Sequence, residues 1–374
     1  MKIILAPDSF KGSLTAKQAA QIMERAAKEV FDCDTRCIPV ADGGEGTLEA
    51  IVDAAGGSYV EKVVTGPLGQ PVAARYGLID GGRTAVVELA EASGITLANP
   101  KNPLRATTRG TGELIRAAAE AGAQRIIVGI GGSATNDGGM GLLTAMGMRF
   151  LDSDGTQMEG CGEELEKVAS IDATDLMSVE MTVICDVTNP LLGPNGATAV
   201  YGPQKGADAD MLERLEKGMA HYAEMMCKAG FADSVFSGAG AAGGVGYALA
   251  GVMGATLKSG IDAVLDAVHF EKAMRDADLV ITGEGRLDEQ TVRYGKVPAG
   301  IVRQCKSCGV PVLAVAGSLG DGAEAFLNMG QTAMEAITER PMELREAVER
   351  AEELLYRATV RTLTAIRLGM NMKR

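Results

Sequence analysis

Apolar residues along the chain fall into short continuous runs that alternate with stretches of helical spacing. Lys2–Ala6 and Thr35–Val40 are short runs that predict strands. Between them, Ser13–Val30 has apolar residues at i, i+3, i+4 and i+7, which predicts a helix, and Thr15 with Gln18 predicts a capping box at its start. Further runs predict buried strands at Arg125–Val128, Met181–Cys185, Leu279–Thr282, Val310–Val315 and Thr332–Ile337.

These later runs are apolar throughout instead of alternating between apolar and polar residues. That pattern is typical of parallel strands that are covered on both faces. A helix is predicted at Gly46–Ala55, and a long closing helix is predicted to begin at Pro341. The alternation of strands and helices therefore favours α/β architecture with parallel sheets.

The middle of the chain has a different pattern. Gly57–Glu91 contains short alternating runs separated by turn sequences, and Phe150–Thr156 is similar, so both predict hairpins. We therefore predict an α/β domain that is interrupted by an inserted α/β (α+β) domain, and the closing helix returns to the first. The predicted boundaries are residues 1–65 and 277–374 for the first domain and 66–276 for the inserted one.

Composition narrows the classes of function. Of 374 residues, 46% are hydrophobic and 23% charged, as in folded soluble proteins, and the net charge of −13 disfavours nucleic-acid or anionic-membrane partners. The seven cysteines and the short apolar run at the N-terminus predict free thiols and a cytoplasmic protein. Ser234–Leu257 carries no charge, but Gly and Ala dominate it, so we expect a buried loop leading into a helix. Monomer and homodimer both remain open.

Several glycine-rich loops directly follow predicted strands. In α/β folds, ligands bind where strands end and helix N-termini point, and phosphate suits such a place. The loop Pro7–Ser13 carries an acid, two hydroxyls and a lysine, and Ala41–Thr47 carries two carboxylates that suit Mg²⁺. The alternative for the second loop is a helix cap at Asp42 followed by glycine turns, and for either loop alone the two interpretations are equally supported.

Two other loops match the GxGxx(G/A) pattern of dinucleotide sites, Gly129–Ala134 and Gly238–Gly243. They support an alternative function, an NAD(P)-dependent oxidoreductase of a small hydroxy acid. Two matches in one chain fit no single NAD site, however, and backbone N–H groups around phosphate explain both. A second alternative is a non-catalytic protein that binds a small anion.

Together the loops supply the groups that phosphoryl transfer requires, which are cations for phosphates, carboxylates for a metal or a proton, and close backbone donors. The cations are Lys11, Lys205, Arg286 and Lys296. The carboxylates are Asp8, Asp42, Glu45, Asp137, Asp186, Glu284 and Asp288.

At these residues the chain resembles the type I glycerate kinases of bacteria. The matching stretches run in family order over nearly the whole chain: Ala6–Ser13, Ala41–Thr47, Gly129–Gly139, Cys185–Pro190 with Gly202–Gly206, and Gly283–Arg286. The resemblance implies ATP-dependent phosphorylation of D-glycerate, usually to 2-phosphoglycerate. It also implies a Rossmann-like domain formed by both chain ends, with the active-site cleft between it and the inserted domain.

The resemblance also suggests roles for single residues. Glycerate is expected to contact Ser9, Arg286 and Asn189, with Lys11 as a further catalytic cation. Asp186 is the first candidate for the catalytic base, and Asp8 is the second. Mg²⁺ is expected at Asp42 or Glu45. ATP is expected to contact Gly131, Gly132, Ser133, Asn136, Lys205, Gly283 and Gly285.

Overall fold

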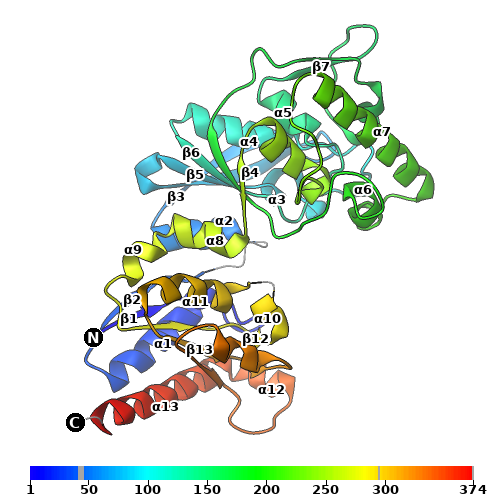
Figure 1. Cartoon of the computed structure of the whole chain (residues 1–374). Coiled ribbons are helices and arrows are strands. Elements are labelled where there is room, and N and C mark those ends of the chain that lie inside the picture. Colours follow the sequence, from blue (N-terminus) through cyan, green and yellow to red (C-terminus); the bar gives the residue numbers. More distant parts are fainter. Residues whose placement is uncertain (41–45, 294, 373–374) are drawn as a thin grey trace. The chain divides into compact units, whose positions relative to one another are not determined.

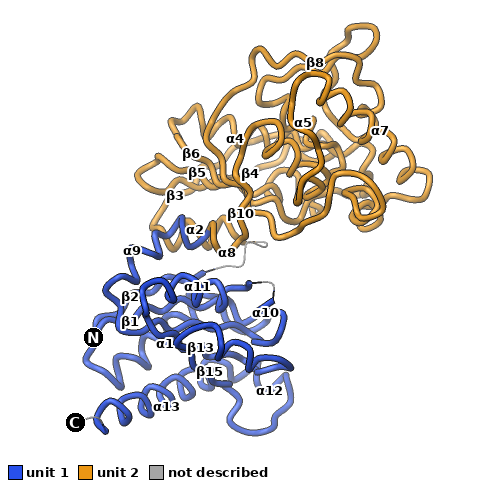
Figure 2. The backbone as a smooth tube through the Cα atoms, in the orientation of Figure 1, with its two compact units in different colours: residues 1–42, 264–374 blue, residues 43–263 orange. Residues whose placement is uncertain are grey.

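The computed structural model describes residues 1–40, 46–293 and 295–372. The chain divides into two compact units, unit 1 (residues 1–42 and 264–374) and unit 2 (residues 43–263) (Figure 2). Unit 1 is therefore built from both ends of the chain. The first boundary lies before residue 65, because β3 (Ser58–Thr65) is a strand of the sheet in unit 2, and the second lies between residues 263 and 264 instead of 276 and 277.

Unit 1 contains a five-stranded sheet in which every neighbouring pair of strands is parallel (Figure 1). Numbered in chain order, the strands lie in the spatial order 2-1-3-4-5, which is the flavodoxin-like arrangement of a doubly wound sheet. The order reverses between β1 and β11, so the carboxyl ends of these two strands flank the crevice where such sheets bind ligands. The five strands are β2 (Asp34–Cys37), β1 (Lys2–Leu5), β11 (Leu279–Thr282), β13 (Val312–Ala316) and β15 (Thr332–Ala336).

Helices cover both faces of this sheet. The helices α1 (Ala16–Val30) and α13 (Ala351–Met372) share one buried cluster with alternate residues of the strands, and α11 (Val297–Cys308) contacts β11 and β13. Burial on both faces explains why the central strands are apolar throughout. β15 was predicted to be buried as well, but it is an edge strand whose residues are partly exposed.

Shorter elements complete unit 1. The closing helix begins later than Pro341 and is interrupted at Arg350, so it forms two helices instead of one. The short elements are α8 (Gly260–Ala267, which starts in unit 2), α9 (Phe270–Met274), β12 (Arg286–Leu287), α10 (Glu289–Arg293), β14 (Ser318–Leu319) and α12 (Leu344–Glu349).

The predicted capping box at the start of α1 is confirmed. The Thr15 hydroxyl accepts from the Gln18 backbone N–H at 3.2 Å, and the Gln18 side chain accepts from the Thr15 N–H at 2.9 Å. Thr15→Ala removes one of these bonds, so we expect it to lower the free energy of unfolding by about 1 kcal/mol. Urea denaturation measures this effect, and an unchanged midpoint would show that the cap contributes nothing. Lys17→Ala, an exposed change one position into the helix, is the control.

Unit 2 contains a six-stranded mixed sheet in the order β10-β9-β6-β5-β4-β3. The first four strands are parallel, and β4 and β3 are antiparallel additions, so the predicted hairpin within Gly57–Glu91 is confirmed. The strands after β3 are β4 (Pro71–Ile79), β5 (Thr84–Glu88), β6 (Arg125–Gly129), β9 (Glu180–Ile184) and β10 (Thr256–Lys258).

Helices of unit 2 form its main core with one face of the sheet, where Leu114, Leu142 and Met219 belong to one buried cluster. The predicted hairpin at Phe150–Thr156 is confirmed, because the Asp152 N–H donates to the Thr156 carbonyl at 3.0 Å and Leu151 bridges to Gln157 in antiparallel fashion. β7 (Arg149–Leu151) also pairs with the distant β8 (Ser170–Asp172). The helices are α2 (Thr47–Ala55), α3 (Ala90–Ser93), α4 (Arg109–Glu120), α5 (Met140–Ala145), α6 (Ala197–Tyr201) and α7 (Ala209–Lys228).

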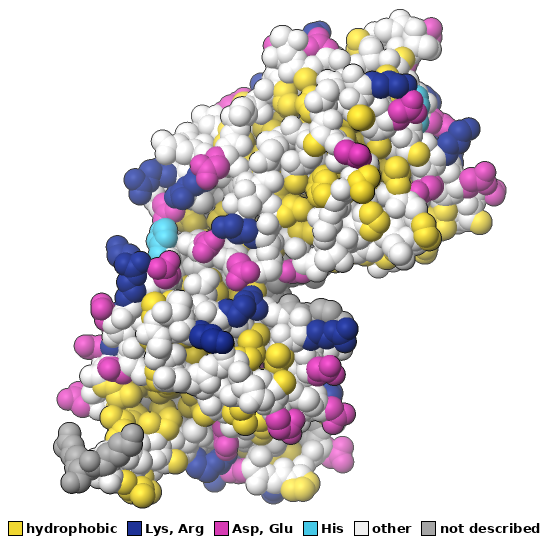
Figure 3. Space-filling model, in the orientation of Figure 1, with side chains coloured by type: hydrophobic (Ala, Val, Ile, Leu, Met, Phe, Trp, Pro, Cys, Tyr) yellow, Lys and Arg dark blue, Asp and Glu magenta, His cyan; other side chains and the backbone are white. Residues whose placement is uncertain are grey.

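The uncharged segment Ser234–Leu257 folds as a glycine-rich loop with a short 3₁₀ turn and a π-helix over Tyr247–Val252. Among the described helices, none combines the length and the apolar character that a membrane crossing requires. On the face seen in Figure 3, basic and acidic side chains lie interspersed over the surface of each unit.

Candidate functional site

A pocket of about 440 Å³ lies in unit 2 at the carboxyl ends of β6 and β9. The loop after β6 and the first residues after β9 line it, so it occupies the position at which parallel strands present ligand-binding groups. Its volume is within the range of small-molecule sites. Five of the residues predicted from the sequence line this pocket together: Gly131, Gly132, Ser133, Asp186 and Lys205.

Lys205 is the cation of this pocket. Its side chain is 2% exposed, and its amine donates to the Ser133 hydroxyl at 2.8 Å and to the Thr135 carbonyl at 2.6 Å. Burial lowers the pKa of Lys205 to about 7, although the carboxylate of Asp137 acts in the opposite direction. A buried amine without a carboxylate in direct contact is stabilised as a cation when an anion arrives.

Asp137, which is fully buried, stabilises the loop between β6 and α5 through hydrogen bonds. Its carboxylate accepts from the Thr108 N–H and hydroxyl at 2.8 and 2.7 Å and from the N–H groups of Gly139 and Gly141 at 3.1 and 3.3 Å. Burial raises the pKa of Asp137, and these four donors oppose the rise. With its lone pairs occupied, Asp137 organises the loop and does not fit the predicted metal or proton-transfer role.

Asn136, predicted to contact ATP, is also fully buried and donates from its amide to the Thr198 hydroxyl at 3.0 Å. Its amide oxygen and the Thr135 hydroxyl are buried without a hydrogen-bond partner among the described residues. Gly132 has a φ of +70°, a conformation that favours glycine. A ligand can therefore approach the backbone of this loop closely, and the polar side chains of the loop are buried behind it.

Asp186 and Asn189 follow β9 and have different surroundings. Asp186 is exposed in the pocket, and its carboxylate accepts from the Gly260 N–H at 2.9 Å. Asn189 donates to the Asn195 carbonyl at 2.9 Å and accepts from the Tyr201 hydroxyl at 2.6 Å. Both ends of the Asn189 amide are therefore occupied within unit 2, and Tyr201, which sequence reasoning missed, lines the pocket.

The dinucleotide patterns lack the structural context that such a site requires, a strand before the loop and a helix directly after it. Gly238–Gly243 follows irregular chain and runs through a 3₁₀ turn. Gly129–Ala134 follows β6, but the next helix begins only at Met140. Neither loop therefore forms the dinucleotide-binding turn.

A second set of predicted residues meets in unit 1, at the switch point between β1 and β11. The Asp8 N–H donates to the Gly283 carbonyl at 2.8 Å. Gly285 lies against the backbone of Phe10 and Lys11, because a Cβ added to it would be 3.4 Å from the backbone nitrogen of Lys11. The loops after the two strands therefore lie side by side. Asp8, Gly283 and Gly285 therefore lie together where β1 and β11 end.

The polar side chains at the carboxyl ends of β1 and β11 differ in exposure. Asp8 is 7% exposed, and its carboxylate accepts from the Ser9 N–H at 2.6 Å. Lys11 and Arg286 are exposed, and Arg286 forms an ion pair with Asp288 at 3.2 Å. Exposed cations beside a strand-end crevice can bind a carboxylate or phosphate, but such exposed pairs contribute little to folding.

Glu284, one of the carboxylates that the sequence offered for a metal or for proton transfer, is buried beside these residues. It is 6% exposed and accepts from the Thr291 hydroxyl at 2.6 Å. Burial raises its pKa to about 7, Thr291 and Lys296 oppose the rise, and the Asp8 and Asp288 carboxylates add to it. Its position directly after β11 was visible in the sequence, but its burial was not.

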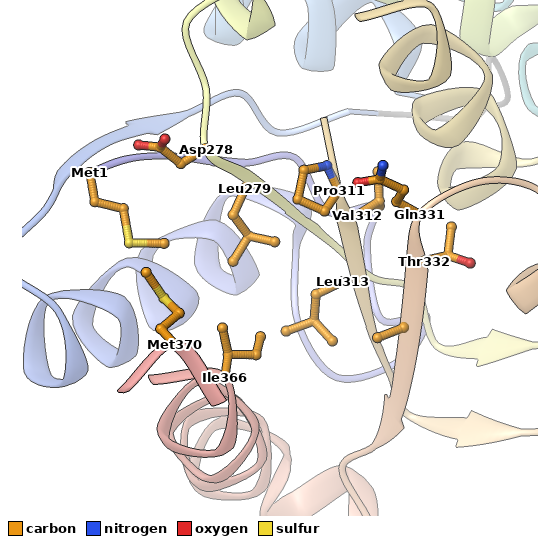
Figure 4. Close-up of a pocket in the computed structure, with 11 residues that line it drawn as sticks. Met1, Asp278, Leu279, Pro311, Val312, Leu313, Gln331, Thr332, Ile366 and Met370 are labelled. Carbon is orange, nitrogen blue, oxygen red and sulfur yellow. The ribbon is translucent and has the colours of Figure 1, made fainter. Parts of the chain in front are cut away.

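A larger cavity of about 770 Å³ lies at the opposite end of the same sheet (Figure 4). It is lined mainly by apolar side chains from the amino-terminal ends of the strands and from α13, such as Leu279, Val312 and Ile366. Its acid, Asp278, accepts from the Lys2 N–H at 2.7 Å. The cavity lacks a cation for a phosphate and lies away from the strand ends that bind ligands, so it is not the candidate site.

Metal binding was predicted at Asp42 and Glu45, and both lie outside the described residues. Within the described residues, no three His, Cys, Asp or Glu side chains are grouped so that they could hold a metal ion.

Comparison with known proteins shows the family to which the chain belongs. The model of the glycerate kinase family matches residues 3–367. The chain is 52% identical to the glycerate kinase of Bacillus subtilis (strain 168), with 100% of this chain and 99% of the relative covered. It is 44% identical to the glycerate 2-kinase of Escherichia coli (strain K12), with 99% of each covered.

A solved structure shows the same similarity over the fold. A crystal structure described as that of a glycerate kinase 2 from Salmonella typhimurium LT2 superposes with a TM-score of 0.89 at 43% identity, covering 99% of both chains. The family resemblance and the two-domain α/β fold predicted from the sequence are both confirmed. The chain is therefore an enzyme of the glycerate kinase family.

Proposed function

We propose that this enzyme transfers the γ-phosphoryl group of ATP to the 2-hydroxyl of D-glycerate and gives 2-phosphoglycerate and ADP. The observation that carries the proposal is the buried Lys205 amine in the pocket of unit 2, beside the backbone of Gly131 and Gly132. A cation next to close-approaching backbone is the arrangement that binds phosphate groups. The glycerate 2-kinase of Escherichia coli, 44% identical over 99% of the chain, supports the choice of substrate and hydroxyl.

In this proposal the phosphates of ATP bind in the pocket of unit 2. The Lys205 amine donates hydrogen bonds to the phosphates, and the backbone N–H groups of the loop after β6 are further donors that glycine leaves unobstructed by side chains. The Asn136 oxygen and the Thr135 hydroxyl, which have no partner among the described residues, are buried within this loop and can hold ordered water. Positioning and charge stabilisation are the main needs of phosphoryl transfer, because the protein does little covalent chemistry.

The residues of unit 1 are proposed to bind glycerate. Lys11, Ser9 and Arg286 can donate to its carboxylate, and a carboxylate must accept the proton of the attacking hydroxyl. Asp186 and Asp8 remain the two candidates for this acceptor from the sequence. Mg²⁺ would neutralise the charge of the phosphates, and Asp42 and Glu45 remain its predicted ligands.

Phosphorus NMR of the purified protein with D-glycerate, ATP and Mg²⁺ tests the proposal. We expect a 2-phosphoglycerate signal that grows as ATP is converted to ADP, and a much slower reaction with L-glycerate. A 3-phosphoglycerate signal would contradict the assignment of the hydroxyl. ATP that stays intact in the presence of D-glycerate would overturn the proposed reaction. A change in NADH absorbance with D-glycerate and NAD⁺ would instead support the oxidoreductase alternative, which the family match does not favour.

A further inference from the structure

Glu284 occupies a position that its backbone fixes from two sides. The residue before it, Gly283, accepts from the Asp8 N–H at 2.8 Å, and the Glu284 carbonyl accepts from the Gly317 N–H at 2.9 Å. The loops after β1, β11 and β13 are therefore joined at this residue. It lies at the switch point of a doubly wound sheet, where ligands of such sheets bind.

One carboxylate oxygen of Glu284 accepts a hydrogen bond from the protein, and the other accepts none from the described residues. Oε1 accepts from the Thr291 hydroxyl at 2.6 Å, and among the described residues no group donates to Oε2. The side chain as a whole is 6% exposed, but Oε2 is not one of the enclosed oxygens without a partner, so it keeps contact with solvent. A carboxylate oxygen that is open to solvent at a strand-end crevice and has no donor within the described residues can accept a proton from a bound hydroxyl.

We propose that Glu284 is the catalytic base of the phosphoryl transfer and that its Oε2 accepts the proton of the glycerate hydroxyl. The inference rests on the proposed function and names the group that performs its proton transfer. The hydroxyl oxygen forms a bond to the γ-phosphorus, the bond from that phosphorus to the β,γ-bridging oxygen breaks, and ADP leaves. The hydroxyl proton moves to Glu284 and is released to solvent after the product leaves.

The surroundings of Glu284 suit a base that works near neutral pH. Burial raises its pKa to about 7, and the charged groups that face it are Asp8 after β1, Asp288 after β12 and Lys296 at the start of α11. A base is most effective when its pKa is close to the working pH. Asp186, the first candidate from the sequence, is instead exposed in the pocket that contains Lys205.

The test is the pH dependence of kcat for D-glycerate phosphorylation between pH 5.5 and 8.5. For the wild-type protein we expect kcat to fall below about pH 7, as the base becomes protonated. Glu284→Gln keeps an acceptor for Thr291 but cannot take a proton, so we expect kcat to fall at least about 100-fold and the acid limb to disappear. The KM for ATP should change little.

Two further variants separate a base from a structural residue. Thr291→Val removes the hydrogen bond that lowers the pKa of Glu284, so the acid limb should move to higher pH while the plateau is retained. Glu289→Gln, an exposed change on α10, is the matched control and should leave both the rate and the limb unchanged.

The outcomes distinguish this inference from the proposed function. Wild-type protein that does not phosphorylate D-glycerate would overturn the proposed function. Active wild-type protein with a Glu284→Gln variant that keeps its acid limb, or keeps kcat within about threefold, would overturn the base assignment alone. Loss of the limb in Asp186→Asn but not in Glu284→Gln would return the role to Asp186. A ¹³C-carboxyl NMR titration of glutamate-labelled protein gives a readout without turnover. We expect a signal that titrates near pH 7, that is absent in Glu284→Gln and that moves when D-glycerate alone is added.

Discussion

Lys205→Met is expected to lower kcat/KM for ATP by about 10³-fold, because it removes the cation from the pocket of unit 2. The wild-type amine is buried and donates to Ser133 and Thr135, so its position is fixed before ligand binds. Methionine has nearly the same length and fills the same space, but it offers no charge and no donor. Steady-state kinetics with varied ATP measures the loss.

Lys101→Met is the matched control for this variant. The Lys101 amine donates to the carbonyl of Gln204, the neighbour of Lys205, at 3.1 Å, but the side chain is exposed. An exposed donor contributes little, so kcat/KM should stay within about twofold of the wild-type value. Equal losses in both variants would mean that a general loss of positive charge, and not the buried amine, explains the effect.

Proton uptake gives an independent test of the same residue. The pKa of Lys205 is about 7 without ligand, and a bound phosphate raises the pKa of a neighbouring amine. At pH 8 the free protein therefore holds a mostly neutral amine, and nucleotide binding should take up about one proton. At pH 6 the amine is already protonated and uptake should vanish. Calorimetry in buffers of different ionisation enthalpy measures the difference, and uptake that persists in Lys205→Met would contradict the assignment.

The free energy of unfolding is expected to depend on pH in the wild-type protein in a way that Lys205→Met lacks. A lysine whose folded-state pKa lies below its unfolded value costs folding free energy below pH 7, and this cost disappears as the pH rises towards 10.5. The wild-type protein should therefore gain stability over this pH range, and Lys205→Met should lack that gain. A variant that is folded and inactive at pH 7 then separates catalysis from folding.

The sequence predicted the strands of unit 1 well where both faces are buried. β1 and β11 appear as unbroken apolar runs because α1 and α13 cover one face while α11 contacts the other side of the sheet. The edge strands were less certain. β2 ends at Cys37 instead of Val40, and β15 is partly exposed, because nothing pairs with an edge strand on its outer side and local patterns do not encode that position.

The candidate site was predicted in part for a similar reason. Strand ends could be located along the chain, so Asp8, Ser133 and Asp186 could be proposed from their position after apolar runs. Burial was not visible in the sequence. Asp137 and Glu284 are both carboxylates among glycines, and only the fold shows that backbone donors and Thr108 occupy the first, while the second keeps an oxygen without a donor among the described residues.

The buried carboxylate of Asp137 leads to the largest expected loss of stability, for Asp137→Ala. The change removes the acceptor of four hydrogen bonds, from the Thr108 N–H and hydroxyl and from the N–H groups of Gly139 and Gly141. Each buried donor left without a partner costs about 1–3 kcal/mol, and relaxation recovers part of the sum. We expect the free energy of unfolding to fall by about 4 kcal/mol or more.

Urea denaturation of the wild-type protein and of Asp137→Ala measures this loss. Asp154→Ala, an exposed carboxylate in a turn of the same unit, is the control and should change stability by less than about 0.5 kcal/mol. A loss for Asp137→Ala below about 1 kcal/mol would show that water replaces the carboxylate.

The same variant also tests how the loop after β6 supports the pocket. Asp137 joins the start of α4, through Thr108, to the glycines that lead into α5, so its loss frees the segment that carries Ser133. At a temperature where the variant is still folded, we expect weaker nucleotide binding than in Asp154→Ala. Unchanged binding would mean that the pocket keeps its form through Lys205, which donates to the same loop at Ser133 and Thr135.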